Sequence, residues 1–229
     1  MAKDVIIACD FSKKEELCKF LDQFKNENPF LKIGYQLFYA TGVELINKLI
    51  DKGFHIFLDL KLHDIPNTVE QGVKSLVALN VDFITVHAAG GNTMMRAAVK
   101  AAKGSLTKIL AVTQLTSTNQ SMLEKELMIE HKMNDVVNHY AVNALEAGVY
   151  GVVCSALESE FIKKKISNNL ITVTPGIRLS SEHDDQARVV TPLQARNNLA
   201  DYIVVGRAIT KDKDPLKAYQ RIKKEFLGK

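Results

Sequence analysis

The segment CDFSKKEE, residues 9–16, follows the first predicted strand and contains no glycine. An open, doubly wound sheet that binds a dinucleotide would carry a GxGxxG turn here, because glycines let the backbone approach the pyrophosphate. The segment therefore argues against an open sheet of that kind. It favours a closed barrel as the way to arrange a chain of alternating strands and helices.

Alternating strands and helices are indicated along the whole chain. Eight short runs rich in β-branched residues recur, and each is followed by a longer segment in which apolar residues have helical spacing. The predicted strands are residues 5–9, 30–34, 55–60, 83–87, 109–114, 151–154, 171–174 and 202–206. The predicted helices are residues 12–25, 35–52, 67–79, 92–102, 134–147, 156–166, 192–198 and 215–226, with one short helix inside the polar interruption at 116–132.

Local signals and strand composition support one α/β domain. Ser12 precedes Glu15 and Glu16 as in a capping box, and Gly53 and Gly148 stand where helices turn back into strands. The strands are almost wholly apolar, as expected for parallel strands covered by helices. No linker-like tract divides the chain. The sequence therefore predicts a single-domain (β/α)8 TIM barrel over the full 229 residues.

Composition and charge argue against several classes of protein. The chain has 30 basic and 26 acidic residues, a formal charge of +4, and only one run of three basic residues, 163–165. We therefore expect no nucleic-acid groove, although a mild positive charge suits a small anionic substrate. No stretch approaches the roughly 18 apolar residues that span a bilayer, so no membrane association is expected. Three cysteines without a CxxC pair predict a reducing, cytoplasmic environment.

The strongest local signal for a site lies at the end of the third predicted strand. Asp59 and Lys61 are two residues apart and should point to the same face, into the mouth of the barrel. Asp64 lies just beyond the strand, and Lys32 comes from the neighbouring strand. These residues predict an array of alternating charge at the carboxyl ends of the strands, where such barrels carry their active sites. The alternative is a structural ion-pair network, or exposed pairs that contribute little.

A phosphate site is predicted in the last two barrel loops. Gly176 and Arg178 follow the seventh strand, and Gly206 and Arg207 follow the eighth, where phosphate sites of these barrels commonly lie. Glycine lets an oxyanion approach backbone N–H groups, and arginine grips two phosphate oxygens. Gln186 would add a neutral donor. The histidines do not share metal-ligand spacing, so no metal site is predicted.

Three regions of the chain resemble the signature regions of the orotidine 5'-phosphate decarboxylase family. They are LDLKLHDIPNTV at 58–69, TPGIR at 174–178 with DDQARVVTP at 184–192, and YIVVGRAIT at 202–210. The resemblance implies a (β/α)8 barrel that needs no cofactor and acts as a homodimer, with both active sites at the subunit interface. It also implies a carboxy-lyase that converts orotidine 5'-phosphate to UMP, the last step of pyrimidine nucleotide biosynthesis.

The resemblance implies roles for the charged residues of the array. Asp10 would hold the ribose of the substrate, and Lys32 would bind the ribose hydroxyls while also touching the array. Asp59 would lie beside the substrate carboxylate. Lys61 would be the proton donor.

The resemblance extends to the partner subunit and to the phosphate. Asp64 and Thr68 would reach into the partner's site, and Thr116 would contact the pyrimidine ring. The loop 175–186, which begins at Pro175, would close as a lid. The phosphate would be bound by Arg178, Gln186, Gly206 and Arg207.

The chemistry implied by the resemblance requires electrostatic stabilisation. Loss of carbon dioxide from C6 of the pyrimidine leaves a carbanion with no adjacent carbonyl to delocalise it, and the sequence shows no lysine-bound cofactor motif. An ammonium group at Lys61 would stabilise the developing charge and then supply the proton.

Two other functions stay open at this point. One is a magnesium-dependent sugar-phosphate decarboxylase or synthase of the same suprafamily, which usually has a metal-binding glutamate where this chain has Lys32. The other is a catalytically silent barrel that binds a phosphorylated metabolite, since the phosphate loops would serve it equally well.

Overall fold

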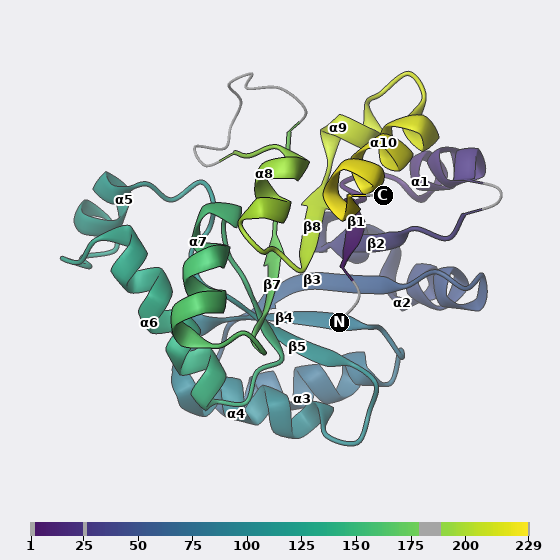
Figure 1. Ribbon diagram of the computed structural model, residues 1–229. Coiled ribbons are helices and arrows are strands. Elements are labelled where there is room, and N and C mark those ends of the chain that lie inside the picture. Colours follow the sequence, from purple (N-terminus) through teal and green to yellow (C-terminus); the bar gives the residue numbers. More distant parts are fainter. Residues whose placement is uncertain (1–2, 25–26, 179–188, 229) are drawn as a thin grey trace.

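The computed structural model describes residues 3–24, 27–178 and 189–228. Its eight strands are parallel and close into a barrel in chain order, with β1 paired to both β2 and β8 (Figure 1). The strands are β1 Asp4–Ala8, β2 Phe30–Gly34, β3 Ile56–Leu62, β4 Phe83–His87, β5 Lys108–Val112, β6 Gly151–Val153, β7 Ile171–Thr174 and β8 Tyr202–Val205. The predicted (β/α)8 barrel is confirmed, and each strand lies within two residues of its predicted bounds.

Helices surround the strands on the outside of the barrel (Figure 1). The helices are α1 Lys14–Leu21, α2 Tyr35–Asp51, α3 Pro66–Val77, α4 Gly91–Ala102, α5 Gln120–Lys125, α6 Met133–Glu146, α7 Ala156–Phe161, α8 Pro192–Asn197, α9 Arg207–Thr210 and α10 Pro215–Leu227. In Figure 1, α3 and α4 lie side by side below β4 and β5, and they pack against each other. The short helix expected within 116–132 is α5, whereas α9 has only four residues and was not predicted.

Apolar side chains form two layers of core. One layer lies inside the barrel and includes Phe30, Phe57 and Phe83, and the other packs the strands against the helices. The ring centroid of Phe83 lies 5.2 Å from that of Phe30 and 5.4 Å from that of Tyr202. These rings come from the first residues of their strands, so they fill the amino-terminal half of the barrel. Toward the carboxyl ends of the strands, polar residues such as Asp59 and Lys61 replace the apolar ones and line a cavity.

Strand β3 is irregular where it carries the predicted charged pair. The pairing of β3 with β4 shifts register between Leu58 and Leu62, so that four steps along β3 face two along β4. Lys61, inside this bulge, has φ of +48°, which is uncommon for a residue with a side chain. Bulges redirect side chains and are frequent next to active sites. The meeting of Asp59 with Lys61 therefore depends on the bulge and not on simple strand alternation alone.

The predicted start of the first helix is wrong. Ser12 does not cap α1, whose N-cap residue is Lys13 without a side-chain hydrogen bond. The backbone N–H of Ser12 donates instead to Oε2 of Glu16 at 3.2 Å. Of the two hydrogen bonds of the predicted capping box, only the one accepted by the glutamate is present, and the glutamate is Glu16 rather than Glu15. The predicted glycine helix ends are confirmed, because Gly53 and Gly148 have φ of +84° and +79°.

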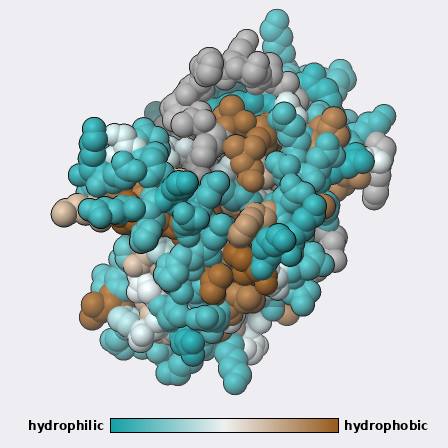
Figure 2. All heavy atoms as spheres, turned by 60° about the vertical axis from the view of Figure 1, so that its left-hand side comes forward, coloured by the Kyte–Doolittle hydropathy of each residue, from teal (hydrophilic) through white to brown (hydrophobic). Residues whose placement is uncertain are grey.

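Hydrophilic side chains predominate on the face shown in Figure 2, which brings forward the left-hand side of Figure 1 with α5 to α7. Apolar side chains appear there as separate patches. The large apolar residues exposed on α6, α7 and α8 are Val142, Leu145, Leu157, Phe161 and Leu193. Within the described ranges, we find no helix with the length and apolar character needed to cross a bilayer.

Candidate active site

The mouth of the barrel contains a cavity of about 660 Å³. This volume is in the range of pockets that bind small molecules. Most of the predicted site residues line it: Asp10, Lys32, Asp59, Lys61, Thr116, Pro175, Arg178, Gly206 and Arg207. The charged array and the predicted phosphate loops therefore share one cavity, which the sequence interpretation required.

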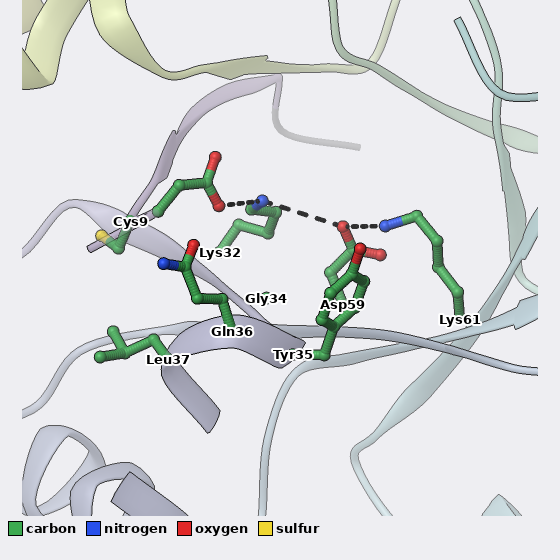
Figure 3. A pocket seen from close by; sticks show the side chains of 9 residues that line it. Cys9, Lys32, Gly34, Tyr35, Gln36, Leu37, Asp59 and Lys61 are labelled. Carbon is green, nitrogen blue, oxygen red and sulfur yellow. Dashed lines mark hydrogen bonds and ion pairs between the residues drawn. The ribbon is translucent and has the colours of Figure 1, made fainter. Parts of the chain in front are cut away.

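Three members of the predicted array of alternating charge, Lys32, Asp59 and Lys61, lie together at the ends of β2 and β3 (Figure 3). The fourth charge is Asp10, after β1, and not the predicted Asp64. Lys32 Nζ lies 2.8 Å from Asp10 Oδ1 and 3.9 Å from Asp59 Oδ2. Lys61 Nζ lies 2.8 Å from the same Asp59 oxygen. Asp59 thus lies between two ammonium groups, and Lys32 lies between two carboxylates. Each charge has neighbours of opposite sign, which a low-dielectric barrel mouth requires.

The array is more buried at its centre than at its edge. The side chains of Lys32 and Asp59 are 13% and 11% exposed, whereas that of Asp10 is 60% exposed. Burial by itself would lower the pKa of Lys32, but the carboxylates of Asp10 and Asp59 outweigh it and raise that pKa above its usual value. Lys32 is therefore held as a cation beside the cavity.

A second, smaller cavity of about 280 Å³ adjoins the array. Figure 3 shows it bordered by Lys32, Asp59 and Lys61, with Tyr35 and Gln36 from the start of α2. Cys9 also lines it, and burial raises the pKa of the Cys9 thiol well above its usual value. The thiol is therefore held in its protonated, unreactive form. Tyr35, Gln36 and Cys9 were not predicted as site residues.

The first predicted phosphate loop, which follows β7, has its two ends joined by backbone hydrogen bonds. Val190 N–H donates to Gly176 O at 3.0 Å, and Arg178 N–H donates to Val190 O at 3.0 Å. Gly176 has φ of +80°, a conformation that favours glycine, so its presence before Arg178 has a backbone reason. These contacts fix the segment around Arg178 against Val190, shortly before α8. Arg207 begins α9 directly after β8, so both arginines face the one cavity from adjacent loops.

Two predicted residues of the described chain, Asp64 and Thr68, do not line the cavity. Asp64 and Thr68 are exposed, and Oδ1 of Asp64 accepts a 2.6 Å hydrogen bond from the Ile65 N–H. Neither residue belongs to the cavity lining of its own chain. Gln186 lies outside the described residues, and so does most of the predicted lid 175–186.

Two residues of β4 lie beside the array, and neither was predicted as a site residue. The Thr85 hydroxyl donates to Asp59 Oδ1 at 3.0 Å and accepts from the Lys61 N–H at 2.8 Å. The ring of His87 lies 5.4 Å from that of His63, centroid to centroid. Burial lowers the pKa of His87 below its usual value near 6.5, and His63 and Lys61 lower it further. Thr85 was missed because a threonine inside an apolar strand looks like an ordinary β-former.

Metal-ligating side chains are not clustered in the part of the chain that the structure describes. No group of three or more histidine, cysteine, aspartate or glutamate residues is arranged there to hold a metal ion. The array instead alternates carboxylates with ammonium groups, and Lys32 Nζ is placed between two carboxylates at 2.8 and 3.9 Å.

Comparisons with known proteins show similarity over nearly the whole chain. The chain matches the family model described as "Orotidine 5'-phosphate decarboxylase / HUMPS family" over residues 3–222. It is 47% identical to the orotidine 5'-phosphate decarboxylase of Bacillus mycoides (strain KBAB4), across 100% of this chain and 99% of that protein. It is 48% identical to the orotidine 5'-phosphate decarboxylase of Malacoplasma penetrans (strain HF-2), across 98% of this chain and 99% of that protein.

A solved structure from a similar protein has the same fold. The crystal structure of orotidine 5'-phosphate decarboxylase from Lactobacillus acidophilus superposes with a TM-score of 0.87 at 40% identity. The match covers 98% of this chain and 99% of that one. The family model and these relatives all span nearly the whole chain, and the chain therefore belongs to the orotidine 5'-phosphate decarboxylase / HUMPS family.

Proposed function

We propose that this chain decarboxylates orotidine 5'-phosphate to UMP, a step of pyrimidine biosynthesis, and that Lys61 stabilises and protonates the C6 carbanion. Membership of the family and the names of the relatives support the reaction. One observation carries the choice of residues: the Asp59–Lys61 ion pair, 2.8 Å long, lines the same cavity as Arg178 and Arg207. A nucleotide can therefore place its base near one end and its phosphate near the other.

In the proposed reaction the C6–carboxylate bond breaks and its electron pair stays on C6 as carbon dioxide leaves. The Lys61 ammonium then gives a proton to C6, forming the C6–H bond of UMP, and is later reprotonated from water. The pyrimidine offers no adjacent carbonyl to take up the charge. Fixed charges must therefore do so, and an ammonium already oriented by a buried carboxylate needs little reorganisation in the transition state.

Asp59 has a second role in this proposal. Placed beside the substrate carboxylate, it would repel that group in the bound state, and the repulsion would be relieved as neutral carbon dioxide forms. Asp59 also orients Lys61. Two unit charges 2.8 Å apart interact by about 6 kcal/mol at an effective dielectric of about 20. This energy is large enough to hold the ammonium in place, but it is only part of what the reaction requires.

Remote binding of the phosphate supplies a further part. Contacts to Arg178, Gly206 and Arg207 would hold the nucleotide at a point far from C6, and that binding energy is available to position the base. We predict that Arg207→Ala lowers kcat/KM for orotidine 5'-phosphate by about 10- to 100-fold, the value of one charge-assisted hydrogen-bonding group. Arg221→Ala, an exposed arginine of α10 outside the cavity lining, is the matched control. An unchanged kcat/KM in Arg207→Ala would rule out the remote-binding account.

We also propose a homodimer in which Asp64 and Thr68 complete the partner's site. Their exposure beside the barrel mouth supports this, as do the exposed apolar side chains of Ile65, Tyr35 and Tyr39 on the loops and helices after β2 and β3. Mixing inactive Asp64→Ala with inactive Lys61→Ala should restore activity, because a mixed dimer has one site with both residues intact. Statistical exchange predicts about a quarter of the wild-type rate. No recovery in a mixture shown to exchange subunits would place Asp64 outside the partner's site.

The magnesium-dependent function is disfavoured by the donor set at the array. Lys32 Nζ lies between the carboxylates of Asp10 and Asp59, the position in which those carboxylates would otherwise bind a cation. Carbon dioxide release from orotidine 5'-phosphate in the presence of a chelator tests all three functions together. No release from orotidine 5'-phosphate together with chelator-sensitive turnover of a sugar phosphate would support the magnesium-dependent function, and phosphate-ester binding without any turnover would support a silent barrel.

A cytoplasmic location completes the proposal. All three cysteines, Cys9, Cys18 and Cys154, are thiols and not disulfides. This is the state expected in a reducing compartment. Fractionation of cells that express the chain tests this location.

A further inference from the structure

One hydroxyl group connects the two halves of the proposed catalytic pair. Thr85, on β4, has a fully buried side chain. Its Oγ1 accepts a hydrogen bond from the Lys61 N–H at 2.8 Å and donates one to Asp59 Oδ1 at 3.0 Å. It therefore contacts the backbone of one charged residue and the carboxylate of the other.

The backbone of Lys61 needs this partner because of the bulge in β3. The β3–β4 register shifts between Leu58 and Leu62, so the ladder is interrupted where the Lys61 N–H points. A buried N–H without an acceptor is costly, and the Thr85 hydroxyl is the acceptor that the strand no longer provides. Lys61 also has φ of +48°, a strained conformation that persists only where its surroundings determine it.

The same hydroxyl decides which way the Asp59 carboxylate faces. With Oδ1 accepting from Thr85, Oδ2 is the oxygen that meets Lys61 at 2.8 Å and Lys32 at 3.9 Å. Rotation of the carboxylate would break the Thr85 hydrogen bond or lengthen both ion pairs. The Asp59 side chain is only 11% exposed, so water has little access to replace a lost donor.

We propose that Thr85 is a positioning residue for decarboxylation, which fixes the carboxylate of Asp59 and the backbone of Lys61 in one geometry. This inference rests on the proposed function. Thr85 acts through these two residues and need not touch the substrate. The buried Thr107 bonds differently, because its hydroxyl donates to the backbone carbonyl of Val81 at 2.7 Å, away from the cavity lining.

Two substitutions separate the hydroxyl from the shape of the side chain. Thr85→Val keeps the volume but removes both hydrogen bonds, and Thr85→Ser keeps the hydroxyl. We expect Thr85→Val to lower kcat for orotidine 5'-phosphate by about 10- to 100-fold, the effect of a small misplacement of reacting groups. KM should change by less than about threefold, because the phosphate contacts are untouched. Thr85→Ser should recover most of the wild-type kcat.

Thr107→Val is the matched control, since it removes a buried threonine hydroxyl of similar burial outside the site. It should lower the melting temperature without lowering the kcat of the folded enzyme. If Thr85→Val does not fold, Thr85→Cys replaces it, because a thiol is a poor substitute for the hydroxyl in both hydrogen bonds. Kcat reduced in Thr85→Cys and kept in Thr85→Ser supports the proposal.

A wild-type kcat in Thr85→Val or Thr85→Cys would overturn the inference, as would a Thr85→Ser variant as slow as Thr85→Val. Wild-type chain that releases no carbon dioxide from orotidine 5'-phosphate would refute the proposed function itself. If only the role of Thr85 is wrong, the wild-type chain is still active. If the proposed function is wrong, the wild-type chain is inactive, so the two failures are distinguishable.

Discussion

Replacing Lys32 by methionine tests whether the array is an interdependent set of charges. Methionine keeps much of the length of the side chain and removes the ammonium, which lies 3.9 Å from Asp59 and 2.8 Å from Asp10. The Asp59 pair corresponds to about 4 kcal/mol at an effective dielectric of about 20. The Asp10 pair contributes less than its 2.8 Å distance suggests, because that carboxylate is 60% exposed and screened by solvent.

Two opposing effects modify the stability lost with this ion pair. The variant no longer pays the desolvation of a buried ammonium, but it leaves a buried carboxylate with one cation fewer. Asp59 keeps Lys61 and the Thr85 hydroxyl. We therefore expect a destabilisation of about 3 kcal/mol, the lower end for a broken buried ion pair. For a chain of this length that corresponds to a melting temperature lower by about 6–12 °C.

Urea unfolding at neutral pH, followed by circular dichroism, measures this loss. Lys164→Met is the control, because Lys164 pairs with Glu160 on the surface of the protein, where both side chains are about half exposed. It should lose no more than about 0.5 kcal/mol. A Lys32→Met variant as stable as Lys164→Met would refute the view that the array is held together by mutual pairing.

The pH dependence of the same difference has a definite sign. Asp10 and Asp59 raise the pKa of Lys32 above its usual value of 10.5 despite burial. The stabilisation from Lys32 is therefore fully present below about pH 10.5 and is lost as the pH rises through the higher, folded-state pKa. The gap between wild type and Lys32→Met should stay constant through neutral pH and narrow only in strongly alkaline solution.

Two further predictions concern stability away from the array. Lys163→Met should lower the free energy of unfolding by about 3–5 kcal/mol, because Lys163 is a nearly buried cation 2.8 Å from Asp201. The kcat should be unchanged, since neither residue lines the cavity. A loss of kcat in the folded variant would contradict this prediction. Burial, His63 and Lys61 lower the pKa of His87 below 6.5, so the unfolded chain binds more protons there and stability should fall as the pH drops below about 6.5. His87→Gln should flatten that slope in urea titrations at successive pH values, whereas the exposed His131→Gln should not.

Much of the barrel could be predicted from local patterns. Strands 30–34, 83–87 and 171–174 have the predicted bounds, because apolar β-branched runs between helical segments leave little choice. The start of α1 was not predictable from Ser12, since the capping-box pattern does not specify which nearby N–H the glutamate reaches. The helix α9 has four residues, too few to show any period.

The site, like the fold, could be predicted only in part from the sequence. Charged residues at strand ends were identifiable because parallel strands of a barrel bring their carboxyl ends together. The bulge at Lys61 was not, because a two-residue period carries no sign of extra residues in one strand. Thr85 depends on that bulge, so its role could not be inferred before the register of β3 with β4 was known.

The central claim is that the Lys61 ammonium carries the chemistry, and its most direct test is the rate of carbon dioxide release from orotidine 5'-phosphate by Lys61→Ala. The account predicts a loss of kcat of at least about 10⁴-fold, the combined value of general acid catalysis and fixed electrostatic stabilisation, with UMP still bound through the phosphate loops. Lys74→Ala, at an exposed lysine of α3, should release carbon dioxide at the wild-type rate. Normal turnover by a folded Lys61→Ala variant would contradict the account.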